Sequence, residues 1–181
     1  MLALANIRNW LRPAPGVAAA RRLYDAIMAA SRDASYFIEG GVADTTDGRF
    51  DLVLIHLILV LRRLKSEGVE GKDLGQRLFD VAFANFDEAL RELGVGDLSV
   101  PKKMRKLAEA FYGRVEAYEK ALGAHNDAAL DEALKKNLYR AAEVKSECIA
   151  FARRKILAFA ARLDATSRDA LLGGTVAGQT A

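Results

Sequence analysis

The feature that most limits the fold of this chain is an apolar run of ten residues, Leu52 to Leu61, interrupted only by His56. Phe50 and Leu64 extend the run at helical spacing, while the residues between them fill the other faces of the same helix. A helix that is apolar nearly all round packs on several sides. Because a bilayer-spanning helix needs about 20 apolar residues, the run predicts the central helix of a folded helical domain and not a membrane span.

The rest of the chain is also helical in pattern, because Ala, Leu, Glu, Lys and Arg dominate and alternating Val, Ile and Thr stretches are missing. Helices are predicted over 21–34, from about Asp47 (itself or a neighbour acting as the N-cap) to 65, over 73–93, over 100–122, and as one or two helices from 127 to about 165. The predicted fold class is therefore all-α: a single compact helical domain of six or seven helices, with a short N-terminal arm and a flexible C-terminal tail.

The predicted domain boundaries follow from changes in composition along the chain. Residues 1–16 form an amphipathic arm and a Pro/Gly-containing linker, residues 17–165 form the helical domain, and residues 166–181 are small, polar and glycine-containing and are expected to be disordered. Candidate membrane contacts in the arm are Leu4, Ile7, Trp10 and Leu11. The alternative for the arm is an end helix docked on the domain.

Composition excludes several classes of enzyme. The 181 residues include one cysteine and two histidines, too few for a His/Cys zinc site or an internal disulfide framework. The same scarcity leaves few candidates for a nucleophile and its base, and no glycine loop with the context of a phosphate-binding motif is present. We therefore expect no catalytic residue, no metal site and no cofactor, and a reducing compartment such as the cytoplasm.

Three polar features could carry a function. Asp44, Asp47 and Arg49 form the densest polar cluster, which either caps the apolar helix or presents a ligand or partner surface. His56 is either a core residue with one hydrogen-bond partner or part of a pocket. Arg114 lies beside an aromatic stripe and could bond a carboxylate such as Asp97 or Asp47.

Two basic patches lie on helices whose apolar stripes are already accounted for. Both patches either face water or contact phosphate, in ribosomal RNA or in anionic lipid head groups. The net charge of +3 is mild and does not indicate a DNA-binding protein. The patches consist of Lys102, Lys103 and Lys106, with Arg105 between them, and of Arg153, Arg154 and Lys155.

Four motifs occur in an order that resembles the ubiquinol–cytochrome c chaperone family, the assembly factors of the respiratory cytochrome bc complex. They are Gly41-Val42-x-Asp44-x-x-Asp47-Gly48-Arg49-Phe50-Asp51, the apolar helix with His56 ending in Arg62-Arg63-Leu64, Leu90-Arg91-Glu92-Leu93-Gly94-Val95-Gly96-Asp97 after a Phe-rich helix, and Val100-Pro101-Lys102-Lys103-Met104 with Phe111-Tyr112-Gly113-Arg114. The resemblance spans roughly residues 21–122.

This resemblance implies a non-enzymatic assembly chaperone that binds newly made cytochrome b. Mitochondrial members act with a small partner protein near the ribosomal tunnel exit, so those two partners are possible here as well. The short N-terminal extension resembles a bacterial member, which implies a cytoplasmic protein that could lie peripherally on the inner face of the membrane.

The candidate partner or client surface is then Asp44, Asp47, Arg49, His56, Lys102, Lys103 and Arg114, and the candidate phosphate or ribosome contacts are Lys106, Arg153, Arg154 and Lys155. An apolar client groove could be lined by the stripes Phe79/Phe83/Phe86 and Met104/Phe111, for which plain core packing is the alternative. Two other functions remain open: a helical ligand-binding protein or enzyme with one polar pocket, and a ribosome- or RNA-associated factor.

Overall fold

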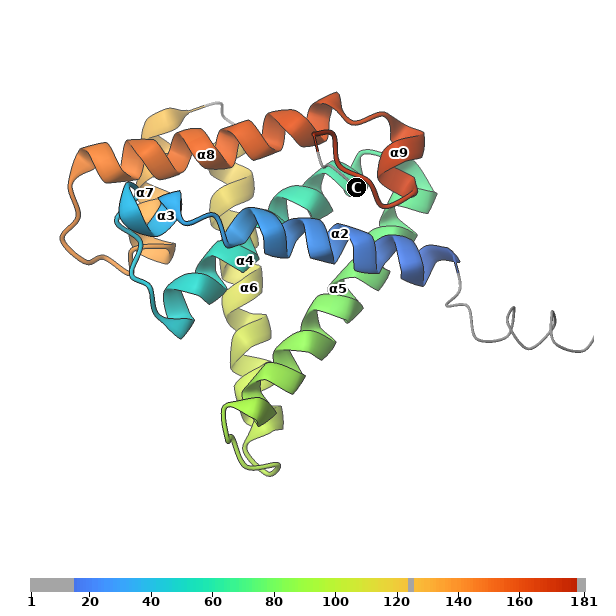
Figure 1. Ribbon diagram of the computed structural model, residues 1–181, viewed down its shortest axis with the longest axis horizontal. Helices are drawn as coiled ribbons and strands as arrows, with labels where there is room; N and C mark the ends of the chain where they lie inside the picture. Colours follow the sequence, from blue (N-terminus) through green and yellow to red (C-terminus); the bar gives the residue numbers. More distant parts are fainter. Residues whose placement is uncertain (1–14, 124–125, 179–181) are drawn as a thin grey trace, which may run out of the picture.

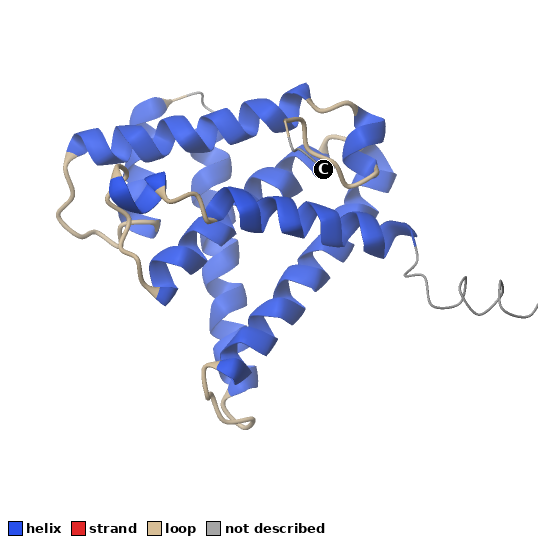
Figure 2. Ribbon diagram, viewed as in Figure 1, coloured by secondary structure: helices blue, strands red, loops and turns tan. Residues whose placement is uncertain are grey.

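The computed structural model describes residues 15–123 and 126–178, and these ranges contain helices and no strand (Figures 1 and 2). The all-α fold class is therefore confirmed. Six helices have 11 to 25 residues and two are short. They are α2 (Pro15–Ser31), α3 (Ser35–Ile38), α4 (Thr46–Lys65), α5 (Gly68–Glu92), α6 (Val100–Gly123), α7 (Asp127–Asn137), α8 (Ser146–Ala165) and α9 (Arg168–Leu172).

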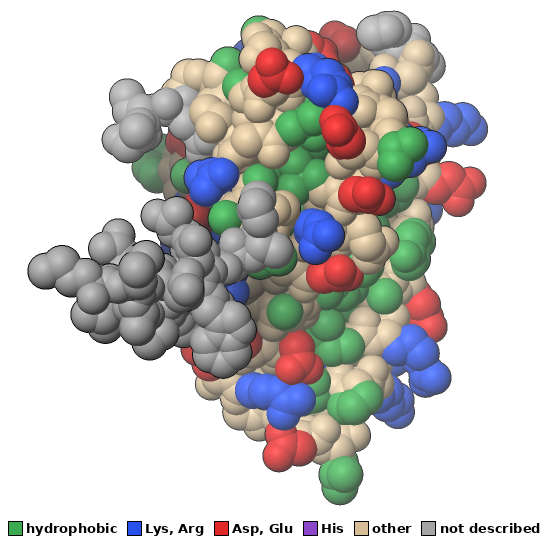
Figure 3. All heavy atoms as spheres, turned by 90° about the vertical axis from the view of Figure 1, so that its right-hand side faces the viewer, with side chains coloured by type: hydrophobic (Ala, Val, Ile, Leu, Met, Phe, Trp, Pro, Cys, Tyr) green, Lys and Arg blue, Asp and Glu red, His purple; other side chains and the backbone are tan. Residues whose placement is uncertain are grey.

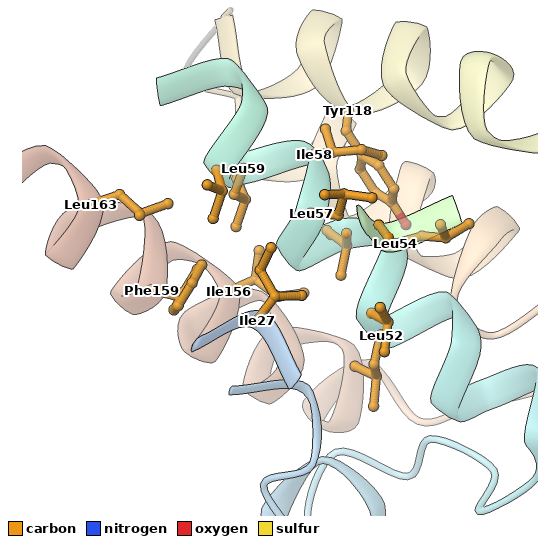
Figure 4. Packing of buried hydrophobic residues seen from close by; sticks show 14 of the residues in the cluster. Ile27, Leu52, Leu54, Leu57, Ile58, Leu59, Tyr118, Ile156, Phe159 and Leu163 are labelled. Carbon is orange, nitrogen blue, oxygen red and sulfur yellow. The ribbon is translucent and has the colours of Figure 1, made fainter. Parts of the chain in front are cut away.

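Helix α4 is the central helix that the apolar run predicts. Every residue from Asp51 to Val60 is buried, and α2, α5, α6 and α8 all pack against it. Figure 4 shows Leu54, Leu57 and Ile58 of α4 among side chains from α2, α6 and α8. Each such fully buried Leu or Ile stabilises the fold by roughly 1.5–3 kcal/mol relative to an exposed side chain.

The start of α4 is fixed by its N-cap. The Thr45 side chain accepts a hydrogen bond from the Gly48 amide. Thr45, two residues before Asp47, is therefore the N-cap. Gly48 is also required by space, since a Cβ there would lie 2.1 Å from the carbonyl oxygen of Ala43. The loop before α4 therefore packs tightly onto the first turn of the helix.

Two helices begin earlier than the sequence pattern predicts. Helix α2 starts at Pro15, six residues before Arg21, because proline is tolerated in a first helical turn, where its missing N–H would have had no partner. Helix α5 starts at Gly68, whose φ of +74° allows a tight turn directly after α4. The connection between the two helices, predicted to run from 65 to 73, is consequently shorter.

The C-terminal segment differs from the disordered tail that was expected from Thr166 onward. Residues 166–178 fold back on the domain, with Leu171 and Val176 almost fully buried and Arg22 donating to the carbonyl oxygen of Gly173. Gly174 lies against the backbone of Ala19, where a Cβ would approach the carbonyl oxygen to 2.6 Å. The small residues that suggested disorder instead permit close packing, so the folded domain extends past 165 to at least 178.

Residues 1–14 of the predicted arm lie outside the described residues, and with them the candidate membrane contacts Leu4, Ile7, Trp10 and Leu11, which remain predictions. Residues 15 and 16, predicted as part of the linker, belong to α2. Among the helices that the structure describes, none combines the length and the apolar character needed to cross a bilayer.

Candidate functional site

An apolar groove of about 510 Å³ lies between the first turn of α4, the C-terminal half of α5 and the N-terminal half of α6. We call it the α4–α6 groove. Its floor is built from hydrophobic side chains of all three helices, and its rim carries mainly basic side chains. The floor consists of Phe50, Phe86, Ala89, Leu90, Leu93, Leu107 and Ala110, and the rim of Thr46, Asp47, Lys103, Lys106, Arg114 and Arg140.

The groove continues toward the hairpin that joins α5 to α6. Leu93 is 62% exposed and Leu98, in the hairpin, is 99% exposed. Figure 3 shows hydrophobic side chains reaching the surface at the lower end of the molecule, where this hairpin lies, among charges of both signs. Exposed apolar area that adjoins an apolar groove is typical of a surface that binds another apolar group.

A buried carboxylate organises the basic rim. Asp51 of α4 is 2% exposed, and its two oxygens accept hydrogen bonds from Nη2 of Arg114 and Nε of Arg140, both at 2.8 Å. Arg140 also pairs with Asp47 at the start of α4. Asp51 therefore holds an arginine from α6 and an arginine from the α7–α8 loop at one edge of the groove.

Burial and charge act in opposite directions at this carboxylate. Burial raises the pKa of Asp51, and the hydrogen bond from Arg140 and the charge of Arg114 oppose that rise. The bond to Asp51 raises the pKa of Arg140. The Nε atom of Arg114 is buried without a hydrogen-bond partner among the described residues, so one donor on this rim is unused.

The structure brings together four residues that the sequence singled out separately. Asp47, Lys103 and Arg114 from the predicted partner surface and Lys106 from the predicted phosphate contacts all line the α4–α6 groove. Lys102 is exposed on the same helix as Lys103 but is not part of the lining. Arg114 bonds Asp51 and neither Asp97 nor Asp47, which corrects the partners suggested from sequence.

Asp44 and Arg49 lie beside the groove and not in it. Arg49 Nε is 2.5 Å from Asp44 Oδ1, and both side chains are about half exposed. The Arg49 guanidinium also lies over the ring of Phe37. Arg49 lines a smaller hollow of about 230 Å³ that shares Phe50 and Phe86 with the groove. Arg49 can therefore still contact a partner on the surface next to the groove.

His56 is not a surface residue, which corrects its place in the predicted partner surface. It is 1% exposed, its Nδ1 lies 2.7 Å from the carbonyl oxygen of Leu52, and its Nε2 lies 3.2 Å from the hydroxyl of Tyr36. Burial lowers the pKa of His56 to about 4. A neutral ring that donates to Leu52 and accepts from Tyr36 satisfies both nitrogens, so this residue has a structural role.

The second basic patch is largely neutralised within the protein. Arg153 pairs with Asp127 and Asp131 of α7, and Lys155 pairs with Asp33. Arg154 is exposed, with its guanidinium over the ring of Phe151. The three residues therefore do not form a free phosphate-binding cluster, and Lys106 belongs to the groove, on another helix.

The predicted aromatic stripes mostly pack against each other. The rings of Phe79 and Phe83 stack with their centroids 4.1 Å apart, and the ring of Phe111 contacts both edge-on. Phe86 contacts Phe50 at 5.0 Å and lines the groove. The core interpretation thus applies to most of these rings, and the client-groove interpretation applies to the end of the stripe at Phe86.

Sequence reasoning missed Arg140 and the central role of Asp51. Arg140 and Ala141 both have positive φ, at 53° and 57°, a conformation that non-glycine residues seldom adopt. No local signal marks such a turn at an arginine, and its partner Asp51 is 89 residues away. The usable signal was Asp51 itself, a carboxylate directly before the apolar run.

Comparisons with known proteins agree with the architecture. A family model described as ubiquinol-cytochrome C chaperone matches residues 39–178. Ubiquinol-cytochrome-c reductase complex assembly factor 1 of Xenopus laevis is 26% identical over 120 residues, covering 66% of this chain and 60% of that protein. Its Mus musculus counterpart is 24% identical over 104 residues, covering 58% of this chain and 35% of that protein.

A solved structure matches over nearly the whole chain. The crystal structure of the Cbp3 homolog from Brucella abortus superposes with a TM-score of 0.81 at 34% identity, covering 99% of this chain and 97% of that one. The chain spans about a third to three fifths of the length of the vertebrate relatives. The matched family region, 39–178, contains the groove-lining helix segments and extends through α9.

Proposed function

Because the chain belongs to the ubiquinol–cytochrome C chaperone family, we propose that it holds newly made cytochrome b during assembly of the respiratory cytochrome bc complex, and that the α4–α6 groove is where it does so. The observation that carries this proposal is the combination of an apolar floor and a basic rim in one open groove of about 510 Å³. A newly made membrane protein presents apolar helices that need cover until they are inserted.

The groove suits a helical apolar segment for geometric reasons. Phe86, Ala89 and Leu90 of α5 and its C-cap residue Leu93 recur at helical spacing, and Lys103, Lys106, Leu107, Ala110 and Arg114 do so on α6. Two such helix faces form a channel into which an apolar helix face can pack, the mode in which amphipathic helices bind grooves. The alanines at 89 and 110 leave room for a client side chain.

The basic rim adds orientation. Lys103 and Lys106 are exposed and form no ion pair among the described residues, whereas Arg114 and Arg140 are held by Asp51. Fixed donors can bond the carboxyl end of a client helix, whose last carbonyls lack partners. The exposed lysines can pair with acidic side chains that flank the apolar segment of the client.

The remaining partners follow from the same role. We place the protein in the cytoplasm, at the inner face of the membrane, where newly made cytochrome b would be met. A small partner protein and the ribosome near its tunnel exit are further candidate partners. Pairing of Arg153 and Lys155 within the protein disfavours their use on ribosomal phosphates and leaves Lys102, Lys103 and Lys106 as the basic surface for such a contact.

The test is complementation of a strain lacking this gene, read as the reduced-minus-oxidised absorbance of b-type haem in membranes. Leu93→Glu places a charge at the groove, while the matched control Val69→Glu places the same charge on an exposed residue in the first turn of α5. We expect the wild type and Val69→Glu to restore the haem signal of the bc complex and Leu93→Glu to restore less than half of it. Equal restoration by both variants would exclude the groove as the client site, and no loss of signal in the deletion strain would exclude the assembly role.

A further inference from the structure

A second apolar depression lies at the opposite end of α4 from the groove. It has a volume of about 410 Å³ and is bounded by the last turns of α4, the end of α6 and the C-terminal half of α8. We call it the α4–α8 trough. Its lining is Leu59, Arg62, Arg63, Ser66, Leu122, Leu157, Ala160, Ala161, Leu163 and Asp164.

The shape of the trough follows from the spacing of its walls. On α4 the lining residues are 59, 62, 63 and 66, and on α8 they include 157, 160, 161 and 164. Each set is one helix face over two turns, which is about 10 Å long. Leu59 and Leu163 are almost fully buried at its base, where Figure 4 shows them on α4 and α8. The trough therefore runs along these two helix faces for about 10 Å, and the short side chains of Ala160 and Ala161 keep it open.

One donor in the trough is unused. The Nη1 atom of Arg62 is buried and, within the ranges that the structure describes, has no hydrogen-bond partner. A buried donor without a partner is costly, and the cost is larger for a charged group. The position of Arg62 near the C-terminus of α4 suits its charge to the helix dipole but does not satisfy this nitrogen.

The other charged groups at the trough are already engaged. Arg63 pairs with Glu67 and donates to the carbonyl oxygens of Leu163 and Thr166. Asp164 is 78% exposed and lies 3.9 Å from Nε of Arg63, so it faces water at the edge. Among the described residues that line the trough, Arg62 is thus the cation left to receive an anion from a ligand.

We infer that the α4–α8 trough binds a single-chain acidic amphiphile, with its acyl chain along the apolar walls and its carboxylate on Arg62. An extended acyl chain matches the length of about 10 Å over which the two helix faces line the trough. Arg62 lines the trough, so a turn of its guanidinium toward the ligand would give the carboxylate a charge-assisted hydrogen bond. This site is separate from the client groove and does not depend on the proposed function.

The experiment is isothermal titration calorimetry of the purified protein with decanoate, at decanoate concentrations below its critical micelle concentration. Acetate serves as the head group without the chain, and octyl glucoside as a chain with an uncharged head. Arg62→Gln tests the head-group contact, and Arg154→Gln removes the same charge from an exposed position on α8. Ala160→Leu fills the trough without changing charge.

We expect saturable decanoate binding by the wild type and by Arg154→Gln, no binding of acetate, and about a tenfold weaker decanoate affinity for Arg62→Gln. Octyl glucoside should bind wild type and Arg62→Gln alike, and Ala160→Leu should remove binding of both amphiphiles. Wild-type protein that binds no decanoate, equal losses in the two arginine variants, or full binding by Ala160→Leu would each overturn the inference. Circular dichroism melts of each variant identify any that fail to fold, and because Arg62→Gln and Ala160→Leu act independently, either one suffices.

Discussion

Replacing Asp51 with asparagine should destabilise the protein far more than its single charge suggests. The side chain is 1% exposed and is bonded by Arg114, which is 15% exposed, and by Arg140, which is 47% exposed. Removing one member of a buried ion pair costs about 3–5 kcal/mol, because a buried charge is left without its partner. The loss of the Arg114 bond contributes nearly its full cost to the destabilisation. Arg140 can turn to water, so the loss of its bond contributes little.

The expected loss is therefore at the lower end of that range. Asparagine keeps one acceptor oxygen in the same place, so we expect Asp51→Asn to reduce the free energy of unfolding by about 3 kcal/mol. For 181 residues, about 2–4 °C of melting temperature per kcal/mol gives a shift of about 6–12 °C. The assay is urea unfolding at pH 7 followed by far-ultraviolet circular dichroism, with a thermal melt alongside.

The matched control is Asp44→Asn, which removes the same charge from a pair whose two side chains are 54% exposed. Such a pair contributes at most about 1 kcal/mol. If the two variants lose unfolding free energies within about 0.5 kcal/mol of each other, burial does not make the Asp51 network costly to break and the prediction is refuted.

Three further predictions concern single residues. Burial lowers the pKa of His56 to about 4, below its unfolded value of about 6.5, so the unfolded chain takes up a proton first as pH falls. The free energy of unfolding, measured by urea titration, should therefore drop by about 3 kcal/mol between pH 7 and pH 4 in the wild type, and this drop should be largely absent in His56→Gln. Gly113 lies inside α6, and apart from its chain neighbours and the local backbone of the helix itself no atom comes within 4 Å of the position that a Cβ would occupy there. Gly113→Ala should therefore stabilise the protein by about 0.5–1 kcal/mol in the same titration; a destabilised variant would contradict the open space at this position. Leu171 is fully buried under the C-terminal segment, so Leu171→Ala should cost about 2–5 kcal/mol, and a cost near zero would mean that the segment does not pack in solution.

The central helix and its surroundings follow from sequence because burial leaves a periodic record. The run from Leu52 to Leu61 predicts α4, and the single stripes of α5 and α6 predict helices that bury one face. The charged network leaves no such record, because Asp51 and Arg140 are joined across 89 residues by a turn at an arginine with positive φ. Pairing of distant charges depends on the packed helices and cannot be inferred from local pattern.

The C-terminal segment shows a different limit. Gly174 and its small neighbours resemble a flexible tail in composition, yet Gly174 is small because it lies against Ala19 of α2. Composition cannot distinguish a small residue in a flexible tail from a small residue that is packed against another segment's backbone. The reverse holds at Gly113, a glycine inside a helix at a position where a Cβ would meet open space.

The most direct test of the account is photo-crosslinking of newly made cytochrome b to the groove. Benzoylphenylalanine at Ala89, which lines the α4–α6 groove, is compared with the same residue at the exposed Ala158 of α8 during translation of cytochrome b in the presence of membranes. We predict a crosslink to cytochrome b from position 89, lost when Leu93→Glu is added, and none from position 158. Crosslinks of equal yield from both positions, or from neither, would contradict the assignment of the groove as the site that holds this client.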